Sequence, residues 1–197
     1  MFPPKLYAGS VITVGELYSI IKNELPHLSV AASMDFLSFL TGFERGSVML
    51  YTNNLVEISE QNIFDFKRVK KGYPVSYLRG THNFFGYDLF VNENVLIPRV
   101  ETEVLVESVL SRIGKDTAPR ILDLCTGSGC ILLALLNEIK TAEGVGVDLS
   151  LEALKVARLN VKKFSLGERS ILVQADVLSV DSLFNTQFDV ITMNPLT

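Results

Sequence analysis

The stretch that decides the fold is Arg120-Ile121-Leu122-Asp123-Leu124-Cys125-Thr126-Gly127-Ser128-Gly129, which is followed by the apolar segment from Cys130 to Ile139. The first five residues are typical of a buried strand, and the segment after Gly129 is long enough for a helix. Small residues between the two let the backbone approach a ligand, and the first turn of a helix offers unpaired N–H groups. The stretch predicts a strand, a ligand-binding loop and a helix, although two glycines alone also fit an ordinary turn.

The rest of the C-terminal part alternates between strand and helix patterns. Further strands are expected at Gly144 to Asp148, Ser170 to Ala175 and Phe188 to Met193, with a helix from Leu151 to Phe164. Alternation of this kind predicts a parallel sheet with covering helices, and therefore an α/β fold.

The first 75 residues have a different pattern, that of short helices. Thr13-Val14-Gly15-Glu16 fits a capping box, and apolar residues then recur at helical spacing up to Leu25. A second helix is expected from Val30 to Leu40 with Gly42 as its end, and a third between Ser59 and Gly72. Residues 1–75 therefore predict a helical bundle.

Between these parts the sequence predicts a linker of mixed structure. Asn83 to Val91 is aromatic and rich in strand-forming residues around Gly86, as in a hairpin. A helix is expected from Glu101 to Ile113, with Val104, Leu105, Val109 and Ile113 facing inward. Three parts follow: a helical domain (1–75), a hairpin-and-helix linker (76–118) and an α/β domain (119–197).

Composition excludes several classes of protein. The chain of 197 residues has a net charge of −4 and a pI near 5.3, which argues against direct nucleic-acid binding. No apolar run approaches the roughly 20 residues that a membrane span needs. The two cysteines, Cys125 and Cys130, flank the loop as reduced thiols would, which favours the cytoplasm. His27 and His82 show no metal-ligand spacing, so no metal is expected.

Polar residues follow the later strands. Asp148 ends the second strand, where a carboxylate can accept ribose hydroxyls, and Asp176-Val177 follows the third, where a nucleoside base would lie. Asn194-Pro195 ends the fourth strand. Each also has a plainer interpretation: a charge at a helix start, a loop carboxylate, and a strand ending in a turn.

The Asn-Pro pair suits one kind of chemistry in particular. An amide nitrogen is a poor nucleophile because its lone pair is delocalised. The side-chain oxygen of Asn194 and the backbone carbonyl of Pro195 can accept the two N–H hydrogens of a substrate amide. They would hold the nitrogen in line with a methyl donor and favour charge developing on it.

The chain resembles the HemK/PrmC family of protein-(glutamine-N5) methyltransferases. Leu96-Ile97-Pro98-Arg99-Val100-Glu101-Thr102-Glu103 matches a motif of that family and departs from it at Val100, where proline is usual. Tyr73-Pro74-Val75-Ser76-Tyr77-Leu78-Arg79-Gly80 and Phe84-Phe85-Gly86 look like the family's linker hairpin. The resemblance implies a class I, Rossmann-like methyltransferase domain with strands in the order 3-2-1-4, as the first part of a seven-stranded sheet. It therefore also implies a C-terminally truncated chain.

The resemblance also implies roles for individual residues. Cys125, Thr126, Gly127, Ser128 and Gly129 would line the methionine part of S-adenosyl-L-methionine, Asp148 would hold the ribose, and Asp176 with Val177 would flank the adenine. Asn194 and Pro195 would be the catalytic pair that binds the substrate glutamine, with Asn194 also beside the cofactor. Leu196 and Thr197 stand at the substrate-binding positions where the family has Pro-Tyr.

The implied reaction is N5-methylation of the glutamine in the Gly-Gly-Gln motif of a peptide-chain release factor, which the helical domain would dock. Because only four strands are present and Pro-Tyr is replaced, we expect weak or absent activity from this chain. Two alternatives stay open: an adenine-N6 nucleic-acid methyltransferase, which shares the Asn-Pro motif, and a non-catalytic fragment that binds a release factor. A nicotinamide-binding domain is disfavoured because the loop lacks the third glycine of the dinucleotide fingerprint.

Overall fold

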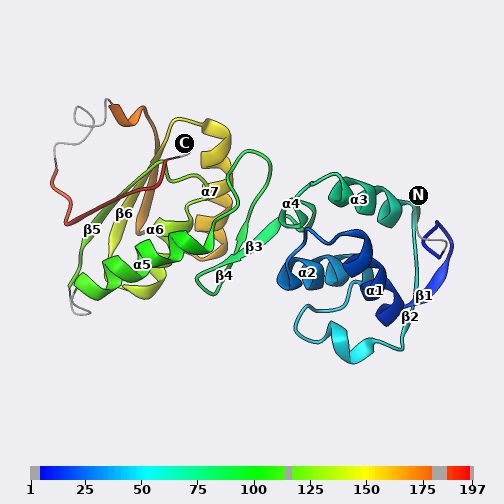
Figure 1. Cartoon of the computed structure of the whole chain (residues 1–197). Helices are drawn as coiled ribbons and strands as arrows, with labels where there is room; N and C mark the ends of the chain where they lie inside the picture. The colour runs from blue at the N-terminus through cyan, green and yellow to red at the C-terminus, as the bar shows by residue number, and fades with distance from the viewer. Residues whose placement is uncertain (1–4, 114–116, 179–185, 196–197) are drawn as a thin grey trace. The chain divides into compact units, whose positions relative to one another are not determined.

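The computed structural model describes residues 5–113, 117–178 and 186–195. The chain divides into two compact units, Met1–Arg79 and Gly80–Thr197 (Figure 1). The three-part division expected from the sequence stays a prediction.

The first unit is a set of short helices closed by a small strand pair. Its elements are β1 (Val11–Thr13), α1 (Val14–Glu24), α2 (Val30–Thr41), the 3-10 helix η1 (Val48–Tyr51), β2 (Leu55–Glu57), α3 (Glu60–Lys70) and α4 (Val75–Arg79). Their core includes the fully buried rings of Phe36 and Phe66, whose centroids lie 5.9 Å apart. The antiparallel pair β1–β2 was not predicted, because three residues are too few to establish an alternating pattern.

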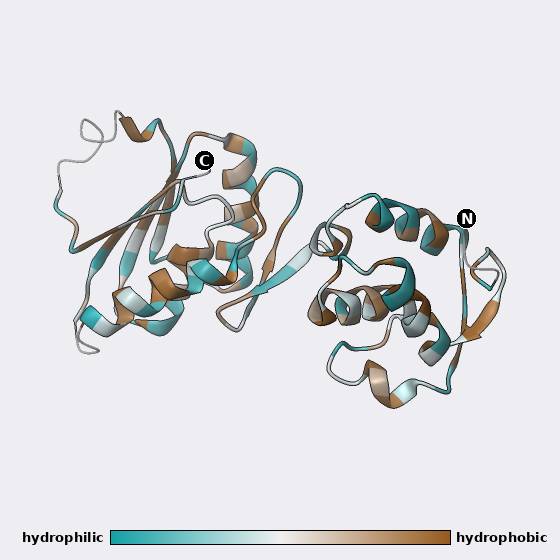
Figure 2. Ribbon diagram, in the orientation of Figure 1, coloured by the Kyte–Doolittle hydropathy of each residue, from teal (hydrophilic) through white to brown (hydrophobic). Residues whose placement is uncertain are grey.

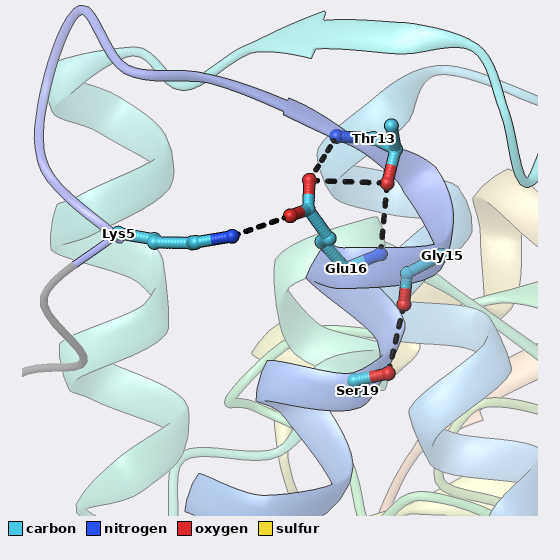
Figure 3. A network of polar contacts seen from close by, with 5 residues as sticks. All are labelled: Lys5, Thr13, Gly15, Glu16 and Ser19. Atoms are coloured by element: carbon cyan, nitrogen blue, oxygen red, sulfur yellow. Dashed lines mark hydrogen bonds and ion pairs between the residues drawn. The ribbon is translucent and has the colours of Figure 1, made fainter.

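The start of α1 confirms the expected capping box (Figure 3). The Thr13 hydroxyl accepts the Glu16 N–H at 3.1 Å, and the Glu16 carboxylate accepts the Thr13 N–H at 3.0 Å. Lys5 donates to the same carboxylate at 2.6 Å. The Lys5 ammonium and the Thr13 donors lower the pKa of Glu16 to about 2.

The second unit begins with a hairpin and a helix and continues as an α/β sheet. Its elements are β3 (Thr81–Phe84), β4 (Tyr87–Phe90), α5 (Val100–Arg112), β5 (Arg120–Leu124), α6 (Cys130–Glu138), β6 (Glu143–Asp148), α7 (Leu151–Lys163), β7 (Ser170–Gln174) and β8 (Val190–Met193). The last four strands form a parallel sheet in the order β7-β6-β5-β8, which confirms the predicted order 3-2-1-4.

Helix α6 forms the centre of this unit. It is largely apolar, brown in Figure 2, and six consecutive residues, Ile131 to Leu136, are buried. Glycines in β6 let it approach the sheet, since a Cβ on Gly144 would lie 2.4 Å from the Leu132 side chain. At its C-terminal end the Arg169 guanidinium donates to the Leu136 carbonyl of the helix and to the Ala142 carbonyl of the following loop, each at 2.9 Å.

The hairpin belongs to the core of this unit. Phe84 and Leu89 are buried with residues of α5 and α6. The turn residues Phe85 and Gly86 have φ of 52° and 81°, the two positive values of a type I′ turn. The Tyr87 hydroxyl donates to Glu138 of α6 at 2.7 Å, and burial, together with this carboxylate, raises the pKa of Tyr87 to about 12.

One prediction about α5 is wrong. Val104 was expected to face inward, but it is 62% exposed, and Val106 is the fully buried residue instead. The reason is that α5 packs mainly against α6, so that its buried stripe runs through Val106, Val109 and Leu110. Val104 lies on the opposite side of the helix, one turn after the exposed Val100.

Candidate functional site

A cavity of about 390 Å³ lies where the four parallel strands end. Each strand contributes residues at or just after its carboxyl end, because parallel strands bring these ends to one edge of the sheet. Of the residues predicted from the sequence, those that line it are Cys125, Thr126, Gly127, Ser128, Asp148, Asp176, Val177, Asn194 and Pro195. Leu196 and Thr197 lie outside the described residues.

The loop between β5 and α6 has a left-handed backbone at three positions. Cys125 and Gly127 both have φ of 56°, and Gly129 has φ of 81°. Gly129 does not line the cavity, and an added Cβ on it would lie 3.1 Å from Leu133 and 3.5 Å from Ala157. Its small size therefore serves the packing of α6 against α7.

A buried carboxylate, Asp123, joins this loop to β8. It accepts a hydrogen bond from the Thr126 hydroxyl at 2.6 Å and one from the Thr192 hydroxyl at 2.7 Å. Burial raises the pKa of Asp123 to about 6, against the two hydroxyl donors, which lower it. Because Thr192 lies two residues before Asn194, Asp123 fixes both the loop and the end of β8.

Asp148 ties the same loop to the start of α7. One carboxylate oxygen accepts the Gly127 N–H at 2.8 Å, and the other accepts the Ser150 N–H at 2.9 Å. The helix is capped by Ser150, whose hydroxyl accepts the Ala153 N–H at 3.1 Å. An ionised carboxylate has about four acceptor positions, so Asp148 can accept further bonds from a ligand.

The loop after β7 brings Asp176 and Val177 to the cavity. Asp176 accepts the Leu178 N–H at 2.9 Å, which closes a small turn around Val177.

Asn194 lies at the wall between the cavity and a second hollow of about 440 Å³. Its side-chain Nδ2 donates to the Thr102 hydroxyl at 3.1 Å. Thr102 belongs to the first turn of α5, within the motif that resembles the HemK/PrmC family. The motif thus contacts the Asn-Pro pair directly, although the two lie 92 residues apart.

Asn160 holds the hairpin to the loop and was missed by sequence reasoning. It is fully buried, its Oδ1 accepts the Phe90 N–H at 2.6 Å, and its Nδ2 donates to the carbonyls of Phe90 and Ser128 at 3.0 and 2.9 Å. An asparagine on the apolar face of α7, between Ala157 and Val161, is the feature that points to it, because buried polar groups need partners.

The two cysteines are free and line the cavity. Burial, with the nearby carboxylates of Asp148 and Asp123, raises the pKa of Cys125, and burial raises that of Cys130 to about 12. Neither thiol is activated as a nucleophile. Within residues 5–113, 117–178 and 186–195, no three His, Cys, Asp or Glu side chains gather as metal ligands would.

Comparison with known proteins shows which proteins the chain is similar to. The family model described as "Methyltransferase domain" matches residues 121–197. The chain is 32% identical over 182 residues to the release factor glutamine methyltransferase of Clostridium acetobutylicum, which covers 90% of this chain and 63% of that protein. It is 44% identical over 122 residues to the enzyme of the same name from Caulobacter vibrioides, over 62% of this chain and 42% of that protein. Over these stretches the chain is similar to the release factor glutamine methyltransferases.

This similarity confirms the resemblance to the HemK/PrmC family that the sequence predicted. The chain spans 63% and 42% of the length of these two relatives. Among solved structures, the N-terminal domain of human METTL16 is similar at 22% identity and a TM-score of 0.47, over 57% of this chain and 47% of that domain. None of the described helices is long and apolar enough to cross a membrane.

Proposed function

We propose that the chain acts in S-adenosylmethionine-dependent N5-methylation of the glutamine in the Gly-Gly-Gln motif of a peptide-chain release factor. The observation that carries the proposal is the cavity at the strand ends, which joins the glycine loop and two carboxylates to Asn194-Pro195. The release factor and the glutamine come from the two relatives described above, which are both named release factor glutamine methyltransferase.

The residues present fit the cofactor. Small-molecule sites commonly have about 300–1,000 Å³, a range that includes this cavity. Asp148 is suited to the two hydroxyls of a ribose, and the apolar Val177, beside Asp176, to the face of an adenine. Bound there, S-adenosylmethionine supplies a methyl group activated by a sulfonium charge, next to Cys125 to Ser128.

The chain's own residues would then hold the acceptor nitrogen. The Asn194 side-chain oxygen and the Pro195 carbonyl accept its two N–H hydrogens, which orients the nitrogen and favours the positive charge that develops on it. Asp123 supports this task at a distance, because it fixes the loop and β8 through Thr126 and Thr192.

The first unit is proposed to dock the release factor. The end of α3 carries Lys67, Arg68, Lys70 and Lys71, and Lys70 is 2.5 Å from Glu24.

A reducing compartment such as the cytoplasm suits the two free thiols.

The test is methyl transfer to a release-factor fragment that contains the Gly-Gly-Gln loop. The chain is incubated with the fragment and S-adenosylmethionine, and mass spectrometry locates any added methyl group. Because weak activity at most is expected from this chain, we expect slow methylation that is confined to that glutamine and absent from a fragment with glutamate in its place. Asn194→Ala should lower this rate further, by at least about a hundredfold. Methylation of adenine in DNA or RNA but not of the fragment would overturn the proposal in favour of the nucleic-acid alternative. Tight binding of the fragment without turnover would leave only a binding role.

A further inference from the structure

Two hollows meet at the Asn-Pro pair. The cavity of about 390 Å³ and the hollow of about 440 Å³ share Leu96, Arg99, Thr102, Asn194 and Pro195 in their walls. The first contains the glycine loop and the carboxylates, and the second is formed mostly by residues 96–105. A side chain that enters the second hollow would therefore reach the first beside Asn194.

The contact between Thr102 and Asn194 decides which end of the Asn194 amide is left for a ligand. The NH2 group donates one of its two hydrogens to the Thr102 hydroxyl at 3.1 Å. This contact turns the NH2 end of the amide toward α5 and leaves the carbonyl oxygen for an incoming group. An oxygen recognises N–H donors. If the amide were turned over, the hydroxyl would donate to Oδ1, and the NH2 group would instead recognise a carbonyl or carboxylate oxygen.

Both partners of this contact are anchored to the core. The Thr102 N–H donates to the Arg99 carbonyl at 2.9 Å within the first turn of α5. The next residue, Glu103, accepts the Phe85 N–H of the hairpin at 2.7 Å. On the other side, the buried Thr192 donates to Asp123 at 2.7 Å. The distance between Thr102 and Asn194 is thus fixed from two sides.

We propose that Thr102 is a positioning residue that turns the Asn194 oxygen toward the acceptor, and that it thereby selects a primary carboxamide over a carboxylate. This inference rests on the proposed function, since it names what chooses glutamine over glutamate at that site. Thr102 acts through Asn194 and does not itself touch the reacting atoms.

The experiment uses the whole chain with Thr102→Val, which keeps the shape and removes the hydroxyl, and Thr102→Ser, which keeps it. Thr141→Val is the matched control, because Thr141 donates to the Thr117 carbonyl in the same unit and lines neither hollow. The first readout is the nitrogen-15 NMR signal of the Asn194 NH2 group, identified as the pair that Asn194→Asp removes. The second is the affinity of the chain, loaded with S-adenosylhomocysteine, for release-factor fragments with glutamine or glutamate in the Gly-Gly-Gln loop.

We expect Thr102→Val to shift the Asn194 signal and to reduce the preference for glutamine about tenfold, the size of one hydrogen bond of about 1.4 kcal/mol. Thr102→Ser and Thr141→Val should keep the wild-type Asn194 signal and the wild-type preference for glutamine. The affinity for S-adenosylhomocysteine should be the same in all variants. An unchanged Asn194 signal in Thr102→Val overturns the inference, as does a wild-type preference for glutamate. If the signal shifts while the wild-type chain binds neither fragment, the proposed acceptor is wrong and the contact that orients Asn194 is real.

Discussion

Replacing Asp123 by asparagine should change how the stability of the second unit depends on pH. Asp123 is fully buried, and burial raises its pKa from 3.8 to about 6. The folded chain therefore holds this proton more tightly than the unfolded chain does. Because the folded pKa is the higher one, stability is lost as the pH rises from about 4 to about 6.

The size of the effect follows from the shift. A difference of about two pKa units corresponds to roughly 3 kcal/mol, of which about half falls between pH 5 and pH 8. Asp123→Asn removes the titration. It can keep both hydrogen bonds, because the hydroxyls of Thr126 and Thr192 can each donate or accept. Relative to the wild type, the free energy of unfolding of the variant should therefore rise by roughly 1 kcal/mol from pH 5 to pH 8.

Amide hydrogen exchange measures this difference in the second unit if the peptide covers β6, which pairs with β5 and does not contain the substituted residue. The intrinsic exchange rate cancels when wild type and variant are compared at the same pH, so that only the free energy of opening remains. The reasoning is refuted if the difference between the two chains is constant from about pH 5 to pH 8, or if the wild type becomes relatively more stable as the pH rises.

Four further substitutions, at three positions, test the local structure. Arg169→Lys should lower the free energy of unfolding in urea by about 1–3 kcal/mol, because the Leu136 and Ala142 carbonyls lose the guanidinium that donates to both. An unchanged midpoint of the urea transition would mean that water replaces these hydrogen bonds. Asn160→Leu should lower the free energy of unfolding by at least about 2 kcal/mol and weaken cofactor binding. The Phe90 backbone and the buried Ser128 carbonyl would lose their hydrogen-bond partner. An unchanged melting temperature would contradict this. Cys125→Gly should be neutral or stabilising by up to about 1 kcal/mol, because Cys125 has φ of 56°. Cys125→Val should destabilise by about 1–3 kcal/mol, and equal melting temperatures for these last two variants would exclude backbone strain at this position.

Much of the fold could be predicted from local patterns. The α/β alternation, the sheet order and the capping box at Thr13 are confirmed, because each depends on residues close together in the sequence or, for the order, on a family resemblance. Val104 was wrongly predicted to face inward, because apolar residues at helical spacing fit more than one face of a helix. The spacing does not say which of these faces packs against a neighbour. In α5 the neighbour is α6, and it selects the stripe around Val106.

The candidate site could be predicted in part. The residues after each strand were found because parallel strands end at one edge. The contacts that hold them together were not. Asp123 with Thr192, Asn160 with Ser128, and Thr102 with Asn194 join residues 69, 32 and 92 positions apart. A single sequence carries no information on pairs at such separations, so these contacts became visible only in the folded chain.

The most direct test of the account is a calorimetric titration of the whole chain with S-adenosylhomocysteine. The cavity at the strand ends predicts one-to-one binding that weakens at least about tenfold in Asp148→Asn, through the loss of a charge-assisted hydrogen bond. Asp88→Asn, on the hairpin and away from the cavity, is the matched control and should bind like the wild type. Binding that is absent from the wild-type chain, or that is equal in Asp148→Asn, would contradict the assignment of this cavity to the cofactor.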